Sequence, residues 1–361
     1  EMSSRGLGDV YKRQPHSRFV PTIYSRVFAA GLLLALQACV AQDPPPAASS
    51  SAALSSSSAI SSSQPASSSS SLKSSSSSSS SVAPISSSSS SAASSSASNL
   101  ISVRPNSGSR QVTVKGQART YHVYVPASYP TNRRVPLVLR YHGIGGNGGQ
   151  EINSNGYRAI ADREGFILVA PSGSQAGGFS GGAWNVGTCC TADRNIDDVA
   201  FAKAIIADVA SYANIDRKRV YATGFSMGGG MTHYLACHAS DEIAAFAPEA
   251  FDLLQENVGQ CQPSRPVPVL SQRATNDSLV IYNGGEDCLT GVCINFLGAV
   301  ETNRVWREKN QCTNEQRFDN NCQINTQCSD GVEVGLCTLS NGHSPASAET
   351  GWAFLKQFQL P

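Results

Sequence analysis

Residues 219–228 read Arg-Val-Tyr-Ala-Thr-Gly-Phe-Ser-Met-Gly, and this stretch decides the fold class of the 361-residue chain. Its first half predicts a β-strand, and the residues from 227 to 238 predict a helix. A Gly-x-Ser-x-Gly motif between a strand and a helix predicts a nucleophile elbow, in which Ser226 stands at the carboxyl end of the strand. Small residues at 224 and 228 would relieve crowding between strand and helix. The alternative is an ordinary glycine-rich turn, and the strand–turn–helix context favours the elbow.

Strands and helices alternate on both sides of this motif. Asp197 and Asp198 stand where the N-cap of a helix belongs. Uniformly apolar strands that alternate with helices predict an α/β fold, with a mostly parallel central sheet and helices on both faces. Strands are predicted at 120–125, 136–141, 166–170, 219–224, 243–247, 267–272 and 332–339, and helices at 152–164, 199–212, 227–238 and 351–358.

Two backbone N–H groups are candidates for binding an oxyanion that develops beside Ser226. The N–H of Met227 lies at the start of a helix, where the helix dipole favours negative charge. The second candidate is the N–H of Ile144, in the sequence YHGIGG at 141–146, where an apolar strand runs into a glycine-rich loop. The alternative is that these glycines only shape a turn. We expect His142 to brace the loop rather than to take part in chemistry.

One of the six histidines suits the role of general base for Ser226. His233 and His238 follow on the same helix, and a rise of about 1.5 Å per residue places them about 10 and 18 Å from its start. Three others precede the serine, whereas the expected chain order after an elbow is serine, acid, histidine. This leaves His343, in the turn-rich sequence SNGHSP at 340–345.

The acid that orients this histidine must follow a buried strand between the serine and the histidine. Asp277, in the loop after the predicted strand at 267–272, meets that condition. Glu249, Asp252 and Asp287 are rivals, and any of them could be a solvated surface charge. The role of the acid is to hold the imidazole tautomer and to stabilise the imidazolium.

Composition divides the chain into a tether and one large domain. Residues 47–98 are almost entirely Ser and Ala, with no apolar surface to offset chain entropy, so 40–98 is predicted to be a disordered linker. Residues 99–361 suit a single α/β domain. A formal net charge of +1 gives no electrostatic footprint for nucleic acid, and no apolar run reaches the roughly 18 residues of a membrane span.

The N-terminal residues predict export. Residues 1–17 are interpreted as a sequencing artefact or an unstructured leader, and 18–39 as a signal peptide. This segment ends in LQAC at 36–39, which resembles a bacterial lipobox and would make Cys39 the site of a lipid anchor. The alternative is ordinary signal cleavage near Ala41. The protein is expected to be secreted or lipid-anchored at a bacterial cell surface.

The cysteines support export. Eleven are present, and setting aside Cys39 leaves ten, an even number that predicts five disulfides in an exported chain. The alternative is a metal site, but no pair of cysteines faces a second pair or a histidine pair at zinc spacing. Adjacent Cys189 and Cys190 are expected to have different partners, because a vicinal ring is strained.

With Ser226, Asp277 and His343 identified, the domain resembles a group of exported α/β-hydrolases. These are the esterases of carbohydrate esterase family one, with feruloyl and acetylxylan esterases, and the polyhydroxybutyrate depolymerase-like proteins. The resemblance covers nearly all of residues 110–358. It is carried by RTY at 119–121, PLV at 136–138, HG at 142–143, WN at 184–185, IDDV at 196–199, RVYATG at 219–224, YNGG at 282–285 and GH at 342–343.

The chain departs from this family at two places. The family usually has His-Gly-Thr before the acid, where this chain has RAT at 273–275, which alters the support of Asp277. It usually has an aromatic residue and Pro after the histidine, where this chain has Ser344 and Pro345. A family bridge near the active site implies that Cys189 or Cys190 pairs with Cys237.

The resemblance implies a serine esterase that works through an acyl-enzyme and needs no cofactor or metal. The expected substrates are esters on plant cell-wall polysaccharide, of the feruloyl or acetylxylan type. One alternative is hydrolysis of polyhydroxybutyrate, another polyester or short-chain esters. An alternative of another class is a catalytically inactive surface lipoprotein that binds polysaccharide. Trp184 is a candidate for stacking on an aromatic acyl group or a sugar, or else for capping the core.

Overall fold

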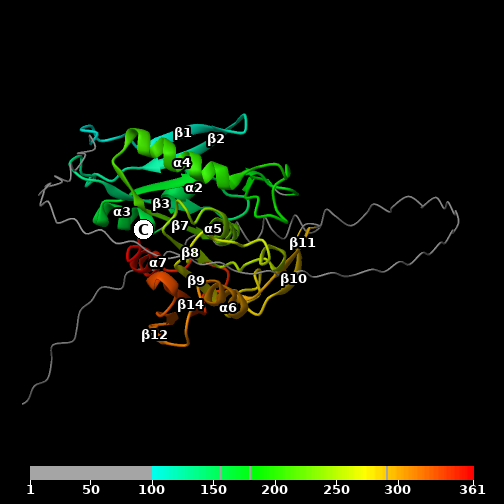
Figure 1. Cartoon of the computed structure of the whole chain (residues 1–361). Coiled ribbons are helices and arrows are strands. Elements are labelled where there is room, and N and C mark those ends of the chain that lie inside the picture. The colour runs from blue at the N-terminus through cyan, green and yellow to red at the C-terminus, as the bar shows by residue number, and fades with distance from the viewer. Residues whose placement is uncertain (1–99, 155, 179, 290–291) are drawn as a thin grey trace, which may run out of the picture. The chain divides into compact units, whose positions relative to one another are not determined.

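A ten-stranded sheet forms the centre of the described part of the chain (Figure 1), and four of its inner strands are buried along their whole length. The computed structural model describes residues 100–154, 156–178, 180–289 and 292–361. A strand covered on both faces needs apolar side chains at consecutive positions, which is why these segments read mainly as continuous apolar runs. Every residue is buried in β3 (Val135–Tyr141), β4 (Ile167–Pro171), β8 (Ala245–Glu249) and β9 (Val269–Ala274).

The strand order is β1-β2-β4-β3-β7-β8-β9-β14-β13-β12. The six strands from β4 to β14 are parallel to one another, and antiparallel pairs extend both edges. The predicted mostly parallel sheet is therefore confirmed. The other strands of this sheet are β1 (Gly108–Val114), β2 (Gln117–Tyr124), β7 (Ile215–Phe225), β12 (Gln316–Asp319), β13 (Cys322–Asn325) and β14 (Val334–Leu339). Two separate two-stranded sheets pair β5 (Ser174–Gln175) with β6 (Gly182–Ala183), and β10 (Gly285–Leu289) with β11 (Val292–Phe296).

Helices cover both faces of the sheet, as expected. Along β3, Leu137 and Leu139 belong to the apolar cluster of one face and Val138 to that of the other, as the two-residue period of a strand requires. The first face is covered by α4 (Asp198–Tyr212), α5 (Met227–His238) and α6 (Ala299–Lys309), and the second by α2 (Gly148–Ser154), α3 (Tyr157–Glu164) and α7 (Ala348–Leu355). Short 3-10 helices span Gln255–Asn257 and Ser329–Gly331.

Several predicted elements are confirmed, and one needs correction. Helix α5 has the predicted bounds, and the side chain of Asp197 caps α4 by accepting the N–H of Ala200 at 2.9 Å. The single helix predicted at 152–164 is wrong, because the structure has α2 and α3 there as separate helices. The sequence NSNG at 153–156, which includes the last two residues of α2 and the N-cap residue of α3, consists of residues with low helix propensity, which accounts for the interruption.

All ten cysteines between Cys189 and Cys337 are paired, so the prediction of five disulfides is confirmed. Both expectations about the adjacent cysteines are wrong, because Cys189 pairs with Cys190 and Cys237 with Cys261. The other eight cysteines pair among themselves, which leaves these two neighbours for each other. Three short-range bridges hold residues 288–337, namely Cys288–Cys293, Cys312–Cys328 and Cys322–Cys337.

The predicted leader (1–17), signal peptide (18–39), lipid-anchor residue Cys39 and linker (40–98) lie outside the described residues. Within the described part of the chain, no helix combines the length and the apolar character that crossing a membrane requires.

Candidate active site

Ser226 occupies the turn between β7 and α5, with a backbone conformation of φ 54° and ψ −125°. Residues with a side chain rarely adopt positive φ, and such conformations persist where the surrounding structure enforces them. Here the N–H of Ser226 donates to the carbonyl oxygen of Glu249 at 3.0 Å, and its own carbonyl accepts the N–H groups of Gly229 and Gly230 at 2.7 and 3.1 Å. The predicted strand–turn–helix is confirmed.

The glycines on either side of Ser226 are required by close backbone approach. A Cβ at Gly224 would lie 2.3 Å from the carbonyl oxygen of Gly228. A Cβ at Gly228 would lie 2.0 Å from the carbonyl oxygen of Tyr141, at the end of β3. Neither position therefore accepts a larger residue without displacement of the backbone, which is the crowding predicted from the motif.

His343 lies in the loop between β14 and α7, and its ring connects Ser226 with Asp277. Its Nε2 is 2.8 Å from Oγ of Ser226, and its Nδ1 is 2.9 Å from Oδ2 of Asp277. The ring also packs on Phe225, with ring centroids 5.1 Å apart. The structure thus brings the three residues singled out in the sequence into one hydrogen-bonded row, called below the Ser–His–Asp row.

Asp277 is buried in the loop that follows β9, with 5% of its surface exposed. Its Oδ1 accepts the backbone N–H groups of Leu279 and Val280 at 2.9 and 3.0 Å. Burial alone would raise the pKa of Asp277, but the hydrogen bonds from His343 and these two N–H groups outweigh it, so the pKa lies below its ordinary value. The carboxyl group is therefore held ionised beside the imidazole.

The loops that carry Asp277 and His343 are joined by Asn276. Its Oδ1 accepts the N–H of Gly342 at 2.9 Å, and its Nδ2 donates to the carbonyl oxygen of Ser340 at 3.2 Å. Sequence reasoning missed this residue, although its position next to Asp277 in a short loop was a usable signal. Asn276 thereby fixes the separation of acid and base.

The loop at 141–146 lies against Ser226. A Cβ at Gly143 would be 3.4 Å from Cβ of Ser226, and Ile144 is the next residue along this loop. Met227 is the first residue of α5, and the first N–H groups of a helix have no acceptor within the helix. Nδ1 of the His142 ring lies 2.7 Å from the carbonyl oxygen of Gly143.

The buried ring of His142 does brace the loop, as expected. Its Nε2 accepts the N–H of Gly173 at 2.9 Å, which requires the proton to be on Nδ1. Burial lowers the pKa of His142, so the neutral ring is favoured.

Sequence comparison relates the chain to known esterases. Residues 119–254 match the family model described as Esterase PHB depolymerase. Feruloyl esterase B of Piromyces equi is 42% identical over 246 residues, which cover 66% of this chain and 45% of that protein. A bifunctional acetylxylan esterase/xylanase of Neocallimastix patriciarum is 30% identical over 250 residues, which cover 68% of this chain and 34% of that protein. The chain thus spans less than half the length of either relative.

Structural comparison supports the predicted fold. The acetyl xylan esterase from Aspergillus awamori superimposes with a TM-score of 0.51 and 15% sequence identity, and the match covers 69% of this chain and 99% of that one. The chain has the α/β-hydrolase fold. The predicted fold class is confirmed, and so is the resemblance to feruloyl and acetylxylan esterases.

Trp184 is fully buried in the hydrolase domain. Its Nε1 donates to the carbonyl oxygen of His142 at 2.8 Å, and its ring lies edge-on to Tyr141 with centroids 5.0 Å apart. The hypothesis that Trp184 stacks on a substrate is wrong, and the alternative of a core residue fits. The reason is that its loop folds back over the end of β3, where the N–H of Gly145 donates to the carbonyl oxygen of Gly182 at 2.8 Å.

The three rival acids have other partners or positions. Glu249 is buried, and its carboxylate pairs with both terminal nitrogens of Arg140. Asp252 is buried and pairs with Arg273. Asp287 lies in the β10–β11 hairpin, outside the ten-stranded sheet. Asp277 is the acid that the structure places beside His343.

Arg273, the departure noted before the acid, supports the loop of Asp277. Its guanidinium is fully buried, pairs with Asp252 and donates from Nη2 to the carbonyl oxygen of Val280 at 2.5 Å. Burial raises the pKa of Asp252 to about 6, although the charge of Arg273 opposes that rise. Through Val280, the Arg273–Asp252 ion pair therefore supports the turn whose N–H groups donate to Asp277.

Potential metal ligands gather at one place in the described residues, where Glu286 lies near Cys288 and Cys293. The two sulfur atoms form a disulfide with each other, and a disulfide is not a thiolate ligand. These residues therefore do not make a metal site in the oxidised protein.

Proposed function

We propose that the hydrolase is a serine esterase that cleaves carboxylic esters on plant cell-wall polysaccharide through an acyl-enzyme. The observation that carries the proposal is the Ser–His–Asp row, with 2.8 Å between Ser226 and His343 and 2.9 Å between His343 and Asp277. A nucleophile, a base within hydrogen-bond reach and an acid that orients the base are the requirements of nucleophilic acyl transfer.

In the acylation step, Oγ of Ser226 attacks the ester carbonyl carbon while Nε2 of His343 takes the hydroxyl proton. Asp277 accepts the Nδ1 proton of His343 in a hydrogen bond, which keeps Nε2 available as the base and stabilises the imidazolium. His343 then gives its proton to the leaving alcohol, and the acyl group stays on the serine. Water then transfers a proton to Nε2 of His343 as it attacks the acyl carbonyl carbon. The bond between that carbon and Oγ of Ser226 breaks, His343 returns the proton to Oγ, and the acid is released.

The oxyanion of both tetrahedral intermediates would be bound by the N–H groups of Met227 and Ile144. The position of Met227 at the helix start supports the first assignment, and the close approach of Gly143 to Ser226 supports the second. Removal of one such donor generally costs about 10²–10³-fold in kcat.

The substrate class rests on the similarity to the feruloyl esterase and the acetylxylan esterase/xylanase. We further propose that the protein is exported, because five disulfides require an oxidising environment. Export as a lipoprotein anchored through Cys39 remains part of this proposal. It predicts a diacylglycerol adduct on that residue, detectable by mass spectrometry of membrane-associated protein.

A second candidate activity is hydrolysis of polyhydroxybutyrate or another polyester. The match of residues 119–254 to the family described as Esterase PHB depolymerase favours it. The chemistry at Ser226 would be the same, and only the acyl and alcohol groups of the substrate would differ.

The test offers methyl ferulate, acetylated xylan and a polyhydroxybutyrate suspension to the purified chain, with Ser226→Ala as the control. Ferulate or acetate release that disappears in the variant supports the cell-wall esterase. Clearing of the polyester alone supports the second candidate. Retention of polysaccharide with no ester turnover would instead favour a catalytically inactive binding protein, and unchanged turnover by the variant would refute Ser226 as nucleophile.

A further inference from the structure

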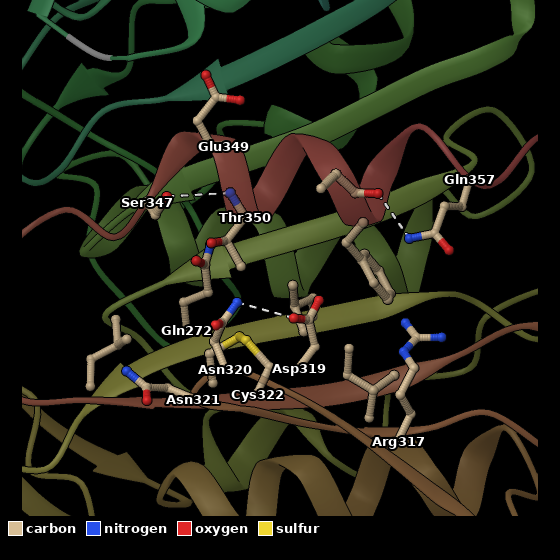
Figure 2. Close-up of a pocket in the computed structure, with 16 residues that line it drawn as sticks. Gln272, Arg317, Asp319, Asn320, Asn321, Cys322, Ser347, Glu349, Thr350 and Gln357 are labelled. Carbon is tan, nitrogen blue, oxygen red and sulfur yellow. Dashed lines mark hydrogen bonds between the residues drawn. A yellow bond between two sulfur atoms is a disulfide. The ribbon is translucent and has the colours of Figure 1, made fainter. Parts of the chain in front are cut away.

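A cavity of about 460 Å³ lies between helix α7 and the edge strands of the sheet (Figure 2). One wall comes from α7 and the residues that flank it, including Ser347 before the helix, Thr350 within it and Gln357 after it. The opposite wall comes from the β12–β13 turn, including Asn320 and Asn321. None of the residues of the Ser–His–Asp row lines it.

The floor of the cavity is apolar. It is formed by Leu270, Ile324 and Phe354 together with the Cys322–Cys337 disulfide, all of which are buried and belong to one apolar cluster. An apolar floor of this kind can cover the C–H face of a sugar ring, in a site whose polar groups fix the orientation.

Gln272 supplies a buried donor to this cavity. Its side chain is 2% exposed and lines the cavity, and its Nε2 has no hydrogen-bond acceptor within the protein. A buried N–H without an acceptor costs about 1–3 kcal/mol, so the amide favours any ligand that brings an oxygen to it. Figure 2 shows Gln272 beside Ser347 and Thr350, at the end of the cavity where α7 begins.

Two of the three charged residues that line the cavity, Arg317 and Glu349, are paired within the protein, whereas Asp319 accepts a hydrogen bond from Nδ2 of Asn320 at 3.0 Å and has no ion pair among the described residues. Both terminal nitrogens of Arg317 bind Glu333, at 2.9 and 3.0 Å. Glu349 accepts both terminal nitrogens of Arg163, each at 2.8 Å. The groups left for a ligand are therefore amides, hydroxyls and the carboxylate of Asp319, which can accept hydrogen bonds from sugar hydroxyls. Planar amides above an apolar floor suit a neutral polyhydroxylated ligand better than an ion.

We propose that this cavity, called here the α7 cavity, is a second binding site for a neutral sugar residue of a polysaccharide. The inference rests on the proposed function, because it identifies the ligand with the polymer that carries the ester. The walls of the α7 cavity continue into the active-site loops: β9, with Gln272, leads to Asp277, and β14, with Leu339, leads to His343. A polymer held there lies beside the segments that present the base and the acid.

The test measures binding of a linear xylo-oligosaccharide by calorimetry, with the full chain carrying Ser226→Ala so that no ester chemistry intervenes. In that background, Gln272→Leu removes the buried donor, and Ala353→Trp fills the α7 cavity from an exposed position on α7. Gln260→Leu, at an exposed glutamine away from the cavity, is the matched control. We expect each cavity variant to weaken binding roughly tenfold: Gln272→Leu because about one good hydrogen bond is lost, and Ala353→Trp because the ligand is displaced. We expect the control to bind as the parent does.

Thermal unfolding of each variant separates loss of binding from loss of the fold, and Ala353→Trp remains informative if Gln272→Leu does not fold. Equal affinity of the parent and Ala353→Trp would overturn the proposal, as would absence of measurable binding by the parent. A separate assay of methyl ferulate, acetylated xylan and a polyhydroxybutyrate suspension by the chain with Ser226 intact reports on the esterase proposal alone. Turnover of any of these esters without sugar binding refutes only the α7 cavity, and sugar binding without turnover of any of them refutes only the esterase.

Discussion

Arg273 donates a hydrogen bond from Nη2 to the carbonyl oxygen of Val280 at 2.5 Å, while the N–H of Val280 donates to Asp277 at 3.0 Å. Val280 thus connects the buried guanidinium of Arg273 with Asp277, the acid of the Ser–His–Asp row. The same guanidinium is paired with Asp252, so the support of the acid depends on a buried ion pair.

Replacement of Arg273 by Leu is expected to destabilise the domain and to lower kcat. Removal of one partner leaves Asp252 buried and unpaired, which costs about 3–5 kcal/mol in comparable pairs. Urea unfolding and ester kinetics measure the two effects. The double variant Arg273→Leu with Asp252→Asn should recover part of the stability but not kcat. Full recovery of kcat in the double variant would show that the contact with Val280 does not position the acid.

Replacement of Asp277 by Asn is expected to lower kcat by about 10³–10⁴-fold, because the amide favours the wrong tautomer of His343. The change is measured as ester kcat at fixed pH, and thermal unfolding checks that the variant is folded. Asp287→Asn is the matched control, since that residue lies in the separate β10–β11 hairpin. A loss of activity in the control equal to that in Asp277→Asn would contradict the assignment of the acid.

The lowered pKa of Asp277 predicts a pH-dependent contribution to stability. Its pKa is lower in the folded than in the unfolded state, where it is about 4, so the ionised group stabilises the fold above that pH. This contribution is lost as pH falls through the folded-state pKa. The free energy of unfolding should therefore fall less between pH 5 and pH 3 in Asp277→Asn than in the parent. Identical slopes would show that this carboxyl has the same pKa in both states.

The two glycines around Ser226 should be intolerant of a methyl group. Gly224→Ala and Gly228→Ala each force a Cβ within 2.3 Å of a backbone oxygen, so we expect a loss of at least about 1–3 kcal/mol and of most activity. Gly259→Ala is the matched control, because a Cβ there meets nothing within 4 Å. Thermal unfolding and ester turnover of the three variants give the comparison. A tolerated alanine at 228 would exclude the close approach of Tyr141.

The two kinds of disulfide should contribute differently to stability. The bridge between Cys237 and Cys261 closes a loop of 24 residues, and its removal as the double serine variant should cost roughly 3 kcal/mol. The Cys189–Cys190 bridge joins neighbours, so its removal should change the loop entropy of the unfolded chain very little. Urea unfolding of the two double variants measures the difference. Thiol titration of the unfolded, unreduced chain should detect none of these ten cysteines.

Sequence reasoning located the parts of the fold that depend on local order along the chain. The turn around Ser226 and the helix that follows it depend on a few consecutive residues. The order serine, acid, histidine depends only on the direction of the chain. Asp277 could be placed because it follows a buried strand. The parallel sheet followed from apolar runs, since burial on both faces leaves that mark on the sequence.

What sequence reasoning missed depends on contacts between distant segments. The burial of Trp184 results from a loop that folds over β3, and a glycine-rich loop carries no periodicity that reveals this. The pairing of Cys189 with Cys190 depends on which sulfur atoms the fold brings together. Arg273 supports the loop of Asp277 through contacts with Asp252 and Val280, which lie in different loops. The α7 cavity lies beside β12 and β13, which are short and partly exposed strands.

The antiparallel hairpin of β12 and β13 joins the parallel sheet through β14 and is linked to it by the Cys322–Cys337 bridge. It contributes none of the groups that would break the ester bond, yet it forms one wall of the α7 cavity. If the α7 cavity binds the polymer as proposed, the wall that contacts it is an addition at the margin of the sheet, separate in the chain from Ser226 and from the loops of Asp277 and His343. Polymer preference and ester cleavage would then depend on different segments, and each could be altered by substitution without changing the other.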